Sequence, residues 1–282
     1  MIASCSLIAA TTLIAKVLGL RGGAYELHPL QISAGRFCFA WMAIALFVMI
    51  RRPSFAGTAW GTHCARSFLG WLGVTAMFAA SASLPLASAT ALSFLSPVVT
   101  MVCAILFLGE RVGIWRWSAA AVSLAGAMLL TKPGAETLQI AALIALAAAL
   151  FMGVEAILIK RLSDNEPPLR ILFINNSIGA VVSLTAAAFV WDWPSDAAWI
   201  LLALLGVTMA SAQALFIQAM KHSEASAVMP LFYSILVFAA LYDYLLFEVV
   251  PDLATAAGAV LIAIGAIAIS IRSAGNRSGR ST

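Results

Sequence analysis

The sequence predicts an all-α membrane protein with ten transmembrane helices arranged in two inverted five-helix repeats. Three observations support this fold class: the composition is too apolar for a soluble domain, ten apolar segments are long enough to cross a bilayer, and one stretch of sequence occurs twice. Of the 282 residues, 63% are hydrophobic and 10% are charged, whereas soluble domains contain about 25% charged residues.

The apolar segments each contain about 17 to 25 residues, the length that crosses the hydrocarbon core as a helix. They cover residues 2–20, 30–50, 66–83, 87–108, 113–131, 138–159, 169–190, 196–218, 225–247 and 253–271. Long apolar runs without alternation favour helices over a β-barrel, because backbone polar groups in lipid must be satisfied internally. The first segment has no cleavage-type end, so we interpret it as a helix and not as a signal peptide.

The duplicated stretch lies in the fourth and ninth segments. An Ala-Ser-Ala triplet that begins at Ala87 returns at Ala225, and with the triplets aligned Glu110 falls on Glu248 without a gap. Duplicated halves in an apolar chain are typical of transporters, in which two similar bundles rock about a central site. The sequence therefore predicts three parts, namely a first repeat, a second repeat and a disordered cytoplasmic tail. Their bounds are 1–133, 134–272 and 273–282.

The distribution of lysine and arginine predicts the orientation. With a cytoplasmic N-terminus, twelve of these residues fall in inner loops or the tail and two in outer loops, as the positive-inside rule requires. Both termini are then cytoplasmic, and a repeat of five helices, an odd number, must be inverted relative to the other. The twelve inner residues are Arg51, Arg52, Arg66, Arg111, Arg116, Lys160, Arg161, Arg170, Lys221, Arg272, Arg277 and Arg280.

Two motifs resemble the EamA family of the drug/metabolite transporter superfamily. The first is Leu-Pro-Leu-Ala-Ser-Ala-Thr-Ala-Leu-Ser-Phe-Leu-Ser-Pro-Val at 84–98, followed by Leu-Phe-Leu-Gly-Glu-Arg-Val at 106–112; the second is Leu-Leu-Phe-Glu-Val-Val-Pro-Asp at 245–252. The resemblance covers nearly the whole chain. It implies a multi-pass protein of the plasma (inner) membrane that moves a small organic solute by secondary transport, with export as the expected direction. Amino acids, nucleobases, riboflavin-like compounds and S-adenosylmethionine are the implied solutes.

Ionisable residues inside membrane helices are candidates for function, because a charge at the helix centre costs about 3 kcal/mol or more. Glu155, in the sixth segment, is the first candidate for substrate binding and for proton coupling, with pairing to Lys160 or Arg161 as the structural alternative. Asp243, in the ninth segment, is a second coupling candidate or a solvated interfacial carboxylate between two tyrosines.

Further substrate-binding candidates lie in other segments. Lys16 and Arg36 could attract an anionic group, pair with Glu26, or extend to the lipid headgroups. Gln213 resembles a glutamine found in this helix in parts of the family, and it could instead join helices by hydrogen bonding. Phe94 and Tyr233 could shape an apolar cavity for a planar solute, or simply pack helices together.

Four residues are expected to have structural or gating roles. Glu110 and Glu248 end the fourth and ninth segments, where a carboxylate can accept hydrogen bonds from the amides of the next helix. Pro97 and Pro230 lie within these two segments and can kink them or leave backbone carbonyls facing a cavity.

Other function classes find less support. Tyr242-Asp243 resembles half of an aspartyl intramembrane protease signature, but its Gly-x-Gly-Asp partner is absent. All three histidines are expected in loops, which leaves a serine enzyme without a buried base. No Walker loop or cofactor motif occurs, and no ligand spacing predicts a metal. An intramembrane enzyme or a non-transporting scaffold remains the alternative; nucleic acid is not an expected partner, protons are a candidate coupling ion, and a homodimer is a candidate assembly.

Overall fold

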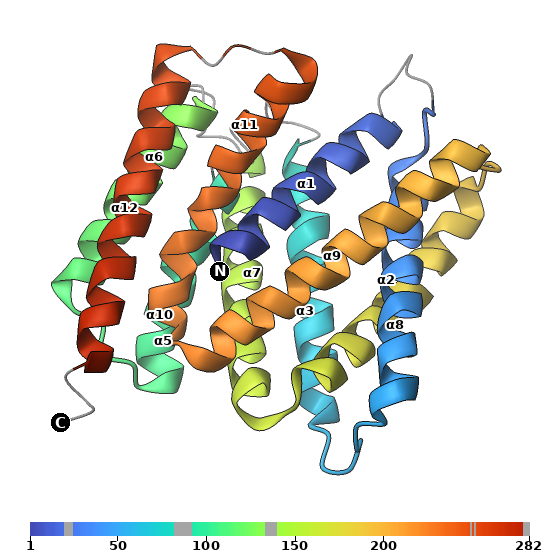
Figure 1. Ribbon diagram of the computed structural model, residues 1–282, viewed down its shortest axis with the longest axis horizontal. Coiled ribbons are helices and arrows are strands. Elements are labelled where there is room, and N and C mark those ends of the chain that lie inside the picture. Colours follow the sequence, from blue (N-terminus) through green and yellow to red (C-terminus); the bar gives the residue numbers. More distant parts are fainter. Residues whose placement is uncertain (20–24, 82–91, 133–139, 249, 251, 279–282) are drawn as a thin grey trace.

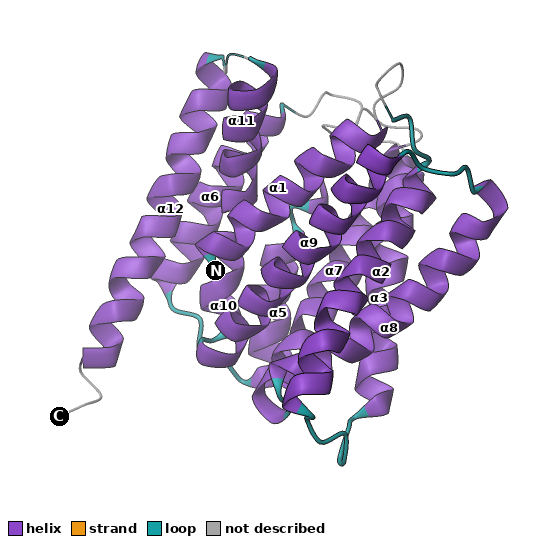
Figure 2. Ribbon diagram, turned by 45° about the vertical axis from the view of Figure 1, so that its right-hand side comes forward, coloured by secondary structure: helices purple, strands orange, loops and turns teal. Residues whose placement is uncertain are grey.

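The computed structural model describes residues 1–19, 25–81, 92–132, 140–248, 250 and 252–278. Within these ranges all regular structure is helical, and the helices form one bundle (Figures 1 and 2). The helices are α1 (Ile2–Gly19), α2 (Pro29–Arg51), α3 (Trp60–Ser81), α5 (Ser96–Leu108), α6 (Ile114–Thr131), α7 (Ile140–Asn165), α8 (Pro168–Ala187), η1 (Ala188–Val190), α9 (Asp196–His222), α10 (Ala225–Val228), η2 (Met229–Tyr233), α11 (Ser234–Phe247) and α12 (Leu253–Ser278).

The described helices are those of a membrane protein. Seven segments are long and apolar enough to cross a bilayer, and the shorter apolar helices Ser96–Leu108 and Leu253–Ala268 accompany them. Large apolar side chains are exposed along these helices, among them Leu106 and Ile200, each 70% exposed. Such a surface is unstable in water and suits lipid, so the chain is an integral multi-pass membrane protein.

Several helix bounds differ from the sequence prediction, because hydropathy locates the lipid-crossing part of a helix and not its polar ends. α3 begins at Trp60 instead of residue 66, and α7 continues to Asn165 instead of ending at 159. α12 continues to Ser278, so the first residues of the predicted tail are helical. The first part of the predicted helix 87–108, with the Ala-Ser-Ala triplet, lies outside the described residues.

The ninth predicted helix is broken. Residues 225–247 form α10, then the 3-10 segment η2, then α11, and Pro230 lies in the first turn of η2. Pro97 likewise occupies the first turn of α5. A proline in the first turn loses no intrahelical hydrogen bond, so each proline marks where a helical segment begins after an interruption.

The two halves of the chain make corresponding helix contacts. The counterpart of each helix is the one that lies five predicted membrane spans further along the chain. α1 packs on α9 and α11, and its counterpart α7 packs on α3 and α5. α2 packs on α8, and α6 on α12, so each of these helices meets its own counterpart; Figure 1 places these two pairs at opposite sides of the bundle. This pattern is expected of two similar halves related by an approximate two-fold axis.

Glycines allow the closest helix crossings. A Cβ on Gly126 of α6 would lie 2.6 Å from the carbonyl oxygen of Gly258 of α12, and a Cβ on Gly258 would lie 2.6 Å from the carbonyl oxygen of Gly126. Gly206 of α9 lies similarly close to the backbone of α2. Small residues let helix backbones approach in lipid, where van der Waals packing replaces the hydrophobic effect as the driving force for association.

We expect the substitution Gly206→Ala to lower the melting temperature in detergent. The added Cβ would lie 2.5 Å from Cβ of Phe39, 2.7 Å from the backbone nitrogen of Ala40 and 2.9 Å from the carbonyl oxygen of Arg36. Backbone atoms cannot rotate away, so α2 and α9 must separate at a cost of about 1–3 kcal/mol. Gly61→Ala is the control, because a Cβ at Gly61 meets nothing within 4 Å. Equal melting temperatures for the two variants would contradict the prediction.

Candidate functional site

An ion pair lies in the interior of the bundle between α3 and α7. The Nε of Arg66 lies 3.6 Å from Oε1 of Glu155, and the two side chains are 5% and 23% exposed. Glu155 lies ten residues before the end of α7, about 15 Å along the helix axis, and Arg66 lies about 9 Å into α3. Both charges are therefore well inside their helices, where an ionisable group is expensive and is by default a candidate for function.

The local sequence of α3 makes room for this pair. Arg66, Gly70 and Gly73 follow at intervals of four and three residues, so they share one helix face. A Cβ on Gly70 would lie 3.0 Å from Cδ of Glu155, and one on Gly73 would lie 2.7 Å from Cγ of Met152. The two glycines thus let α7 approach α3 and leave space for the carboxylate.

Arg66 is the residue that the sequence reasoning missed. With a helix expected to start at residue 66, Arg66 counted as an inner-loop arginine, whereas α3 starts at Trp60 and carries Arg66 inward. Lys160, which was considered as a partner of Glu155, instead lies 2.7 Å from Asp164. The spacing of Arg66, Gly70 and Gly73 is the signal in the sequence that could have identified this face.

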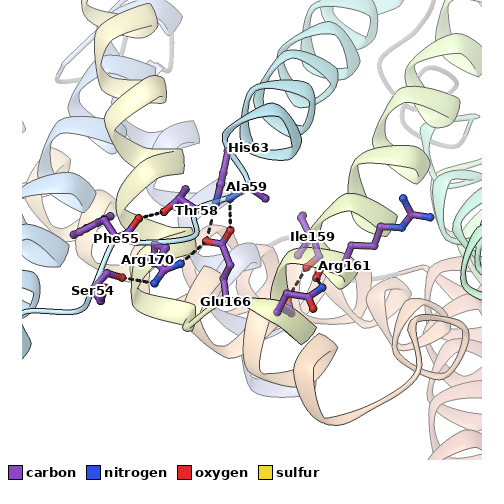
Figure 3. A network of polar contacts seen from close by, with 11 residues as sticks. Ser54, Phe55, Thr58, Ala59, His63, Ile159, Arg161, Glu166 and Arg170 are labelled. Atoms are coloured by element: carbon purple, nitrogen blue, oxygen red, sulfur yellow. Dashed lines mark hydrogen bonds and ion pairs between the residues drawn. The ribbon is translucent and has the colours of Figure 1, made fainter.

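A second buried polar cluster lies one turn closer to the start of α3 (Figure 3). Glu166, whose side chain is 3% exposed, accepts a hydrogen bond from the backbone N–H of Ala59 at 2.8 Å. Its Oε2 lies 3.1 Å from Nε2 of His63 and 3.6 Å from Nη1 of Arg170. Arg170 also donates to the carbonyl oxygen of Ser54. Glu166 therefore joins the α2–α3 connection to the α7–α8 connection.

The hydrogen bonds and charges around Glu166 control its ionisation. Burial raises the pKa of this carboxyl, but the Ala59 amide, His63 and Arg170 outweigh burial and hold the pKa below its ordinary value. Glu166 is therefore an ionised carboxylate at neutral pH.

The expectation that all histidines lie in loops is wrong for His63, which lies in α3 and is 1% exposed, and for His222, which is the last residue of α9. A buried base is thus present, and Ser67 follows it one turn later. The Nδ1 of His63 and the Oγ of Ser67 are both buried without a hydrogen-bond partner, so no bond joins them. The argument that a serine enzyme would lack a buried base therefore does not hold for the described chain.

Lys16 and Asp243 meet at the opposite end of the bundle. The Nζ of Lys16 on α1 lies 2.7 Å from Oδ1 of Asp243 on α11, and their side chains are 45% and 39% exposed. Asp243 also lines a cavity of about 360 Å³ between the adjacent ends of α6, α11 and α12. Apolar side chains line this cavity together with Lys132, Asp243, Asp252 and Thr255. An exposed pair of this kind contributes little to stability, about 0–1 kcal/mol.

The other two polar candidates, Gln213 and Arg36, each contact a neighbouring side chain. The Nδ2 of Asn176 on α8 donates to Oε1 of Gln213 on α9 at 3.0 Å, which is the interhelical bond considered as the structural alternative. The guanidinium of Arg36 lies over the ring of Phe37, 4.2 Å from its centroid. No hydrogen bond joins Glu155 to Gln213 within the described residues, so the predicted binding residues do not form one contact cluster in this conformation.

The aromatic candidates pack against each other. The hydroxyl of Tyr233 donates to the carbonyl oxygen of Phe94 at 2.8 Å, and the ring centroids are 5.9 Å apart. Tyr233 is fully buried, in an apolar cluster with residues of α6 and α12. The two residues therefore connect the interrupted helix of one half to the interrupted helix of the other.

Glu110 caps a helix, but not the one that follows it. Its carboxylate accepts hydrogen bonds from the backbone N–H groups of Ala225 at 2.7 Å and Ser226 at 3.0 Å, at the start of α10. Arg116 pairs with Glu224 at the same place. Glu248, in contrast, is exposed and occupies the left-handed position that ends α11. The start of α12 is capped by Asp252, whose Oδ1 accepts from the N–H of Thr255 at 3.0 Å.

Comparison with known proteins agrees with this architecture. The model of the EamA-like transporter family matches residues 1–132 and again 139–271. An S-adenosylmethionine uptake transporter of Rickettsia bellii is 31% identical over 90% of this chain and 86% of its own length. The pseudopaline exporter CntI of Pseudomonas aeruginosa is 30% identical over 80% of this chain and 81% of its own. A riboflavin transporter of Vibrio cholerae is 29% identical over 76% and 72%.

A solved crystal structure shares the fold, with a TM-score of 0.79 at 20% identity over 95% of this chain and 96% of that chain. The two family matches correspond to the two halves whose packing is exchanged, and the matched relatives are named for the movement of small metabolites, which points away from an enzyme. The chain therefore belongs to the EamA-like transporter family.

Proposed function

We propose that this protein is a secondary transporter that carries a small organic metabolite across the inner membrane by alternating access. In this proposal the two repeats contribute ten transmembrane helices in inverted orientation, and both termini are cytoplasmic. The packing of α1 on α9 and α11 corresponds to the packing of α7 on α3 and α5. This correspondence supports the proposal, because inverted halves can exchange conformations to open one side or the other.

The observation that carries the proposal is the Glu155 carboxylate. It lies within α7, is partly exposed, and accepts no hydrogen bond from the described residues, so the Arg66 guanidinium at 3.6 Å compensates only part of a charge that is costly at this depth. A charged group of the solute supplies that compensation when it binds. Gln213 on α9, whose Oε1 accepts from Asn176, offers its amide nitrogen to the solute as a neutral contact. Phe94 and Tyr233 border the solute only when the interrupted helices separate.

Several features of the mechanism follow as parts of the same proposal. Glu110, bonded to the start of α10, closes the cytoplasmic end, and the Lys16–Asp243 pair closes the other end. Opening either side requires these contacts to break. Arg36 attracts an anionic part of the solute, and Glu155 or Asp243 carries a proton if transport is proton-coupled. The net direction follows the solute and ion gradients, and the relatives include both an uptake protein and an exporter.

The experiment that tests the function is counterflow in proteoliposomes. Purified protein is reconstituted, each vesicle population is preloaded with one unlabelled solute, and accumulation of the labelled solute is followed. The panel contains the twenty L-α-amino acids, S-adenosylmethionine, riboflavin, nucleobases and polyamines. We expect saturable accumulation of at least one solute above protein-free vesicles. A flat response across the panel would count against a transporter of these metabolites.

A further inference from the structure

The guanidinium of Arg66 has buried hydrogen-bond donors without acceptors. Its Nε and Nη1 are both buried, and neither has a hydrogen-bond partner, because the 3.6 Å approach to Glu155 is too long for a hydrogen bond. Most buried polar groups in proteins have a partner, and an unpartnered charged donor is among the most costly exceptions. This donor set is therefore suited to an acceptor that comes from outside the chain.

Glu155 supplies hydrogen-bond acceptors next to the N–H donors of Arg66. Its carboxylate lies beside the guanidinium, is partly exposed, and packs directly on Gly70, where a Cβ would lie 3.0 Å from Oε1 and 3.1 Å from Oε2. The buried N–H donors of Arg66 on α3 thus lie beside the partly exposed carboxylate oxygens of Glu155 on α7, and the two groups have opposite charges. Each has its charge only partly compensated by the other.

We propose that Arg66 and Glu155 together bind the zwitterionic head of an α-amino acid or of a solute that carries such a head. Arg66 donates to the solute carboxylate through the forked N–H groups that suit this anion, and Glu155 accepts from the solute ammonium. The two charges of an amino acid are as close together as those of the ion pair. Such a solute therefore gives each side chain a new partner and leaves no charge uncompensated.

Solutes of other charge types do not satisfy this condition. A solute with only an ammonium would draw Glu155 away and leave the Arg66 guanidinium buried without a counter-ion, and a solute with only a carboxylate would do the reverse. Leaving one member of a buried pair uncompensated is strongly unfavourable. The pair therefore selects zwitterions over matched amines and matched acids. This inference rests on the proposed transport function and names its substrate class.

The test compares matched solutes in the counterflow assay. For each amino acid of the panel that is transported, the amine lacking the carboxylate is measured as a competitor. In the wild type we expect the amino acid to compete at much lower concentration than its amine. In Arg66→Gln the half-maximal concentration of the amino acid should rise about ten- to a hundred-fold, the effect of losing a charge-assisted hydrogen bond. That of the amine should fall, because no guanidinium is left without its counter-ion when the amine binds Glu155.

A purely structural role for the pair predicts a different result. If Arg66 only holds α3 against α7, Arg66→Gln lowers the amount of folded protein and shifts both solutes equally, and that outcome would overturn the proposal. Arg66→Lys covers the case in which the glutamine variant does not fold, because it keeps the charge but loses the fork; it should weaken the amino acid selectively.

Failure of this inference and failure of the transport function are distinguishable. Wild-type transport restricted to riboflavin, nucleobases or polyamines would overturn the zwitterion site and leave the transport function standing. Transport of no solute in the panel would count against both.

Discussion

The substitution Glu155→Gln is expected to reduce solute transport about ten- to a hundred-fold while the protein still reaches the membrane. The carboxylate is the partly exposed acidic group beside Arg66, and the loss of a charge-assisted bond to a solute costs about 1.5–3 kcal/mol. The amide keeps the shape of the side chain, so the packing against Gly70 is retained. The measurement is the initial counterflow rate per folded transporter, across a range of solute concentrations.

Two control variants separate solute recognition from general damage. Asp164→Asn changes an exposed carboxylate on the same helix and should transport like the wild type, because Asp164 pairs with Lys160 near the end of α7. Glu155→Asp keeps the charge but retracts it toward α7, so it should retain more activity than the glutamine variant. Normal transport by Glu155→Gln would remove this residue from both recognition and coupling.

The substitution Glu166→Gln is expected to destabilise the protein by about 3–5 kcal/mol, the usual effect of removing one partner from a buried ion pair. The change leaves His63 and Arg170 buried without the carboxylate that joins them. It should be seen as a lower melting temperature in detergent at pH 7. Asp164→Asn serves again as the control, because the Asp164 carboxylate is 43% exposed and Lys160 keeps a second acceptor, the carbonyl oxygen of Met220.

The difference between wild type and Glu166→Gln should also depend on pH. Because the folded protein holds the pKa of Glu166 below its ordinary value, the carboxylate stabilises the fold above the unfolded pKa of about 4.3, and the effect is lost as the pH falls through the folded pKa. The gap in melting temperature should therefore stay constant from neutral pH to about pH 5 and narrow below that. A gap that persists unchanged in acid would show that Glu166 acts by packing and not by charge.

The fold class could be predicted from the sequence because the apolar segments and the duplication are patterns that extend over many residues. Helix ends are harder to predict from the sequence. The first turns of α3 are too polar to be recognised as part of an apolar segment, so the hydropathy pattern predicts a loop where the structure has His63 and Arg66 in a helix. Glu155 was identified from its chemistry alone, since a carboxylate in an apolar run is conspicuous. Its partner could not be identified, because the pairing depends on how α3 and α7 cross in space.

The partner of Glu110 likewise could not be predicted from the sequence. A carboxylate at the end of an apolar segment predicts a helix cap, and the physics of capping is local. Which helix is capped depends on the arrangement of the two halves, and the start of α10 is 115 residues away along the chain. The sequence therefore predicts that Glu110 caps a helix but not which helix it caps.

The bond from Glu110 to α10 also bears on whether one half of the chain could fold without the other. The first half supplies the acceptor for amide groups that the second half leaves open, and the glycine contact between α6 and α12 likewise needs one residue from each half. Neither half is complete as a folding unit by itself. A chain of five helices alone would leave these groups without partners and would have to assemble with a second such chain to supply them. Joining the halves in one chain holds them at equal stoichiometry, and it lets the Arg66 charge of one half be matched by Glu155 of the other.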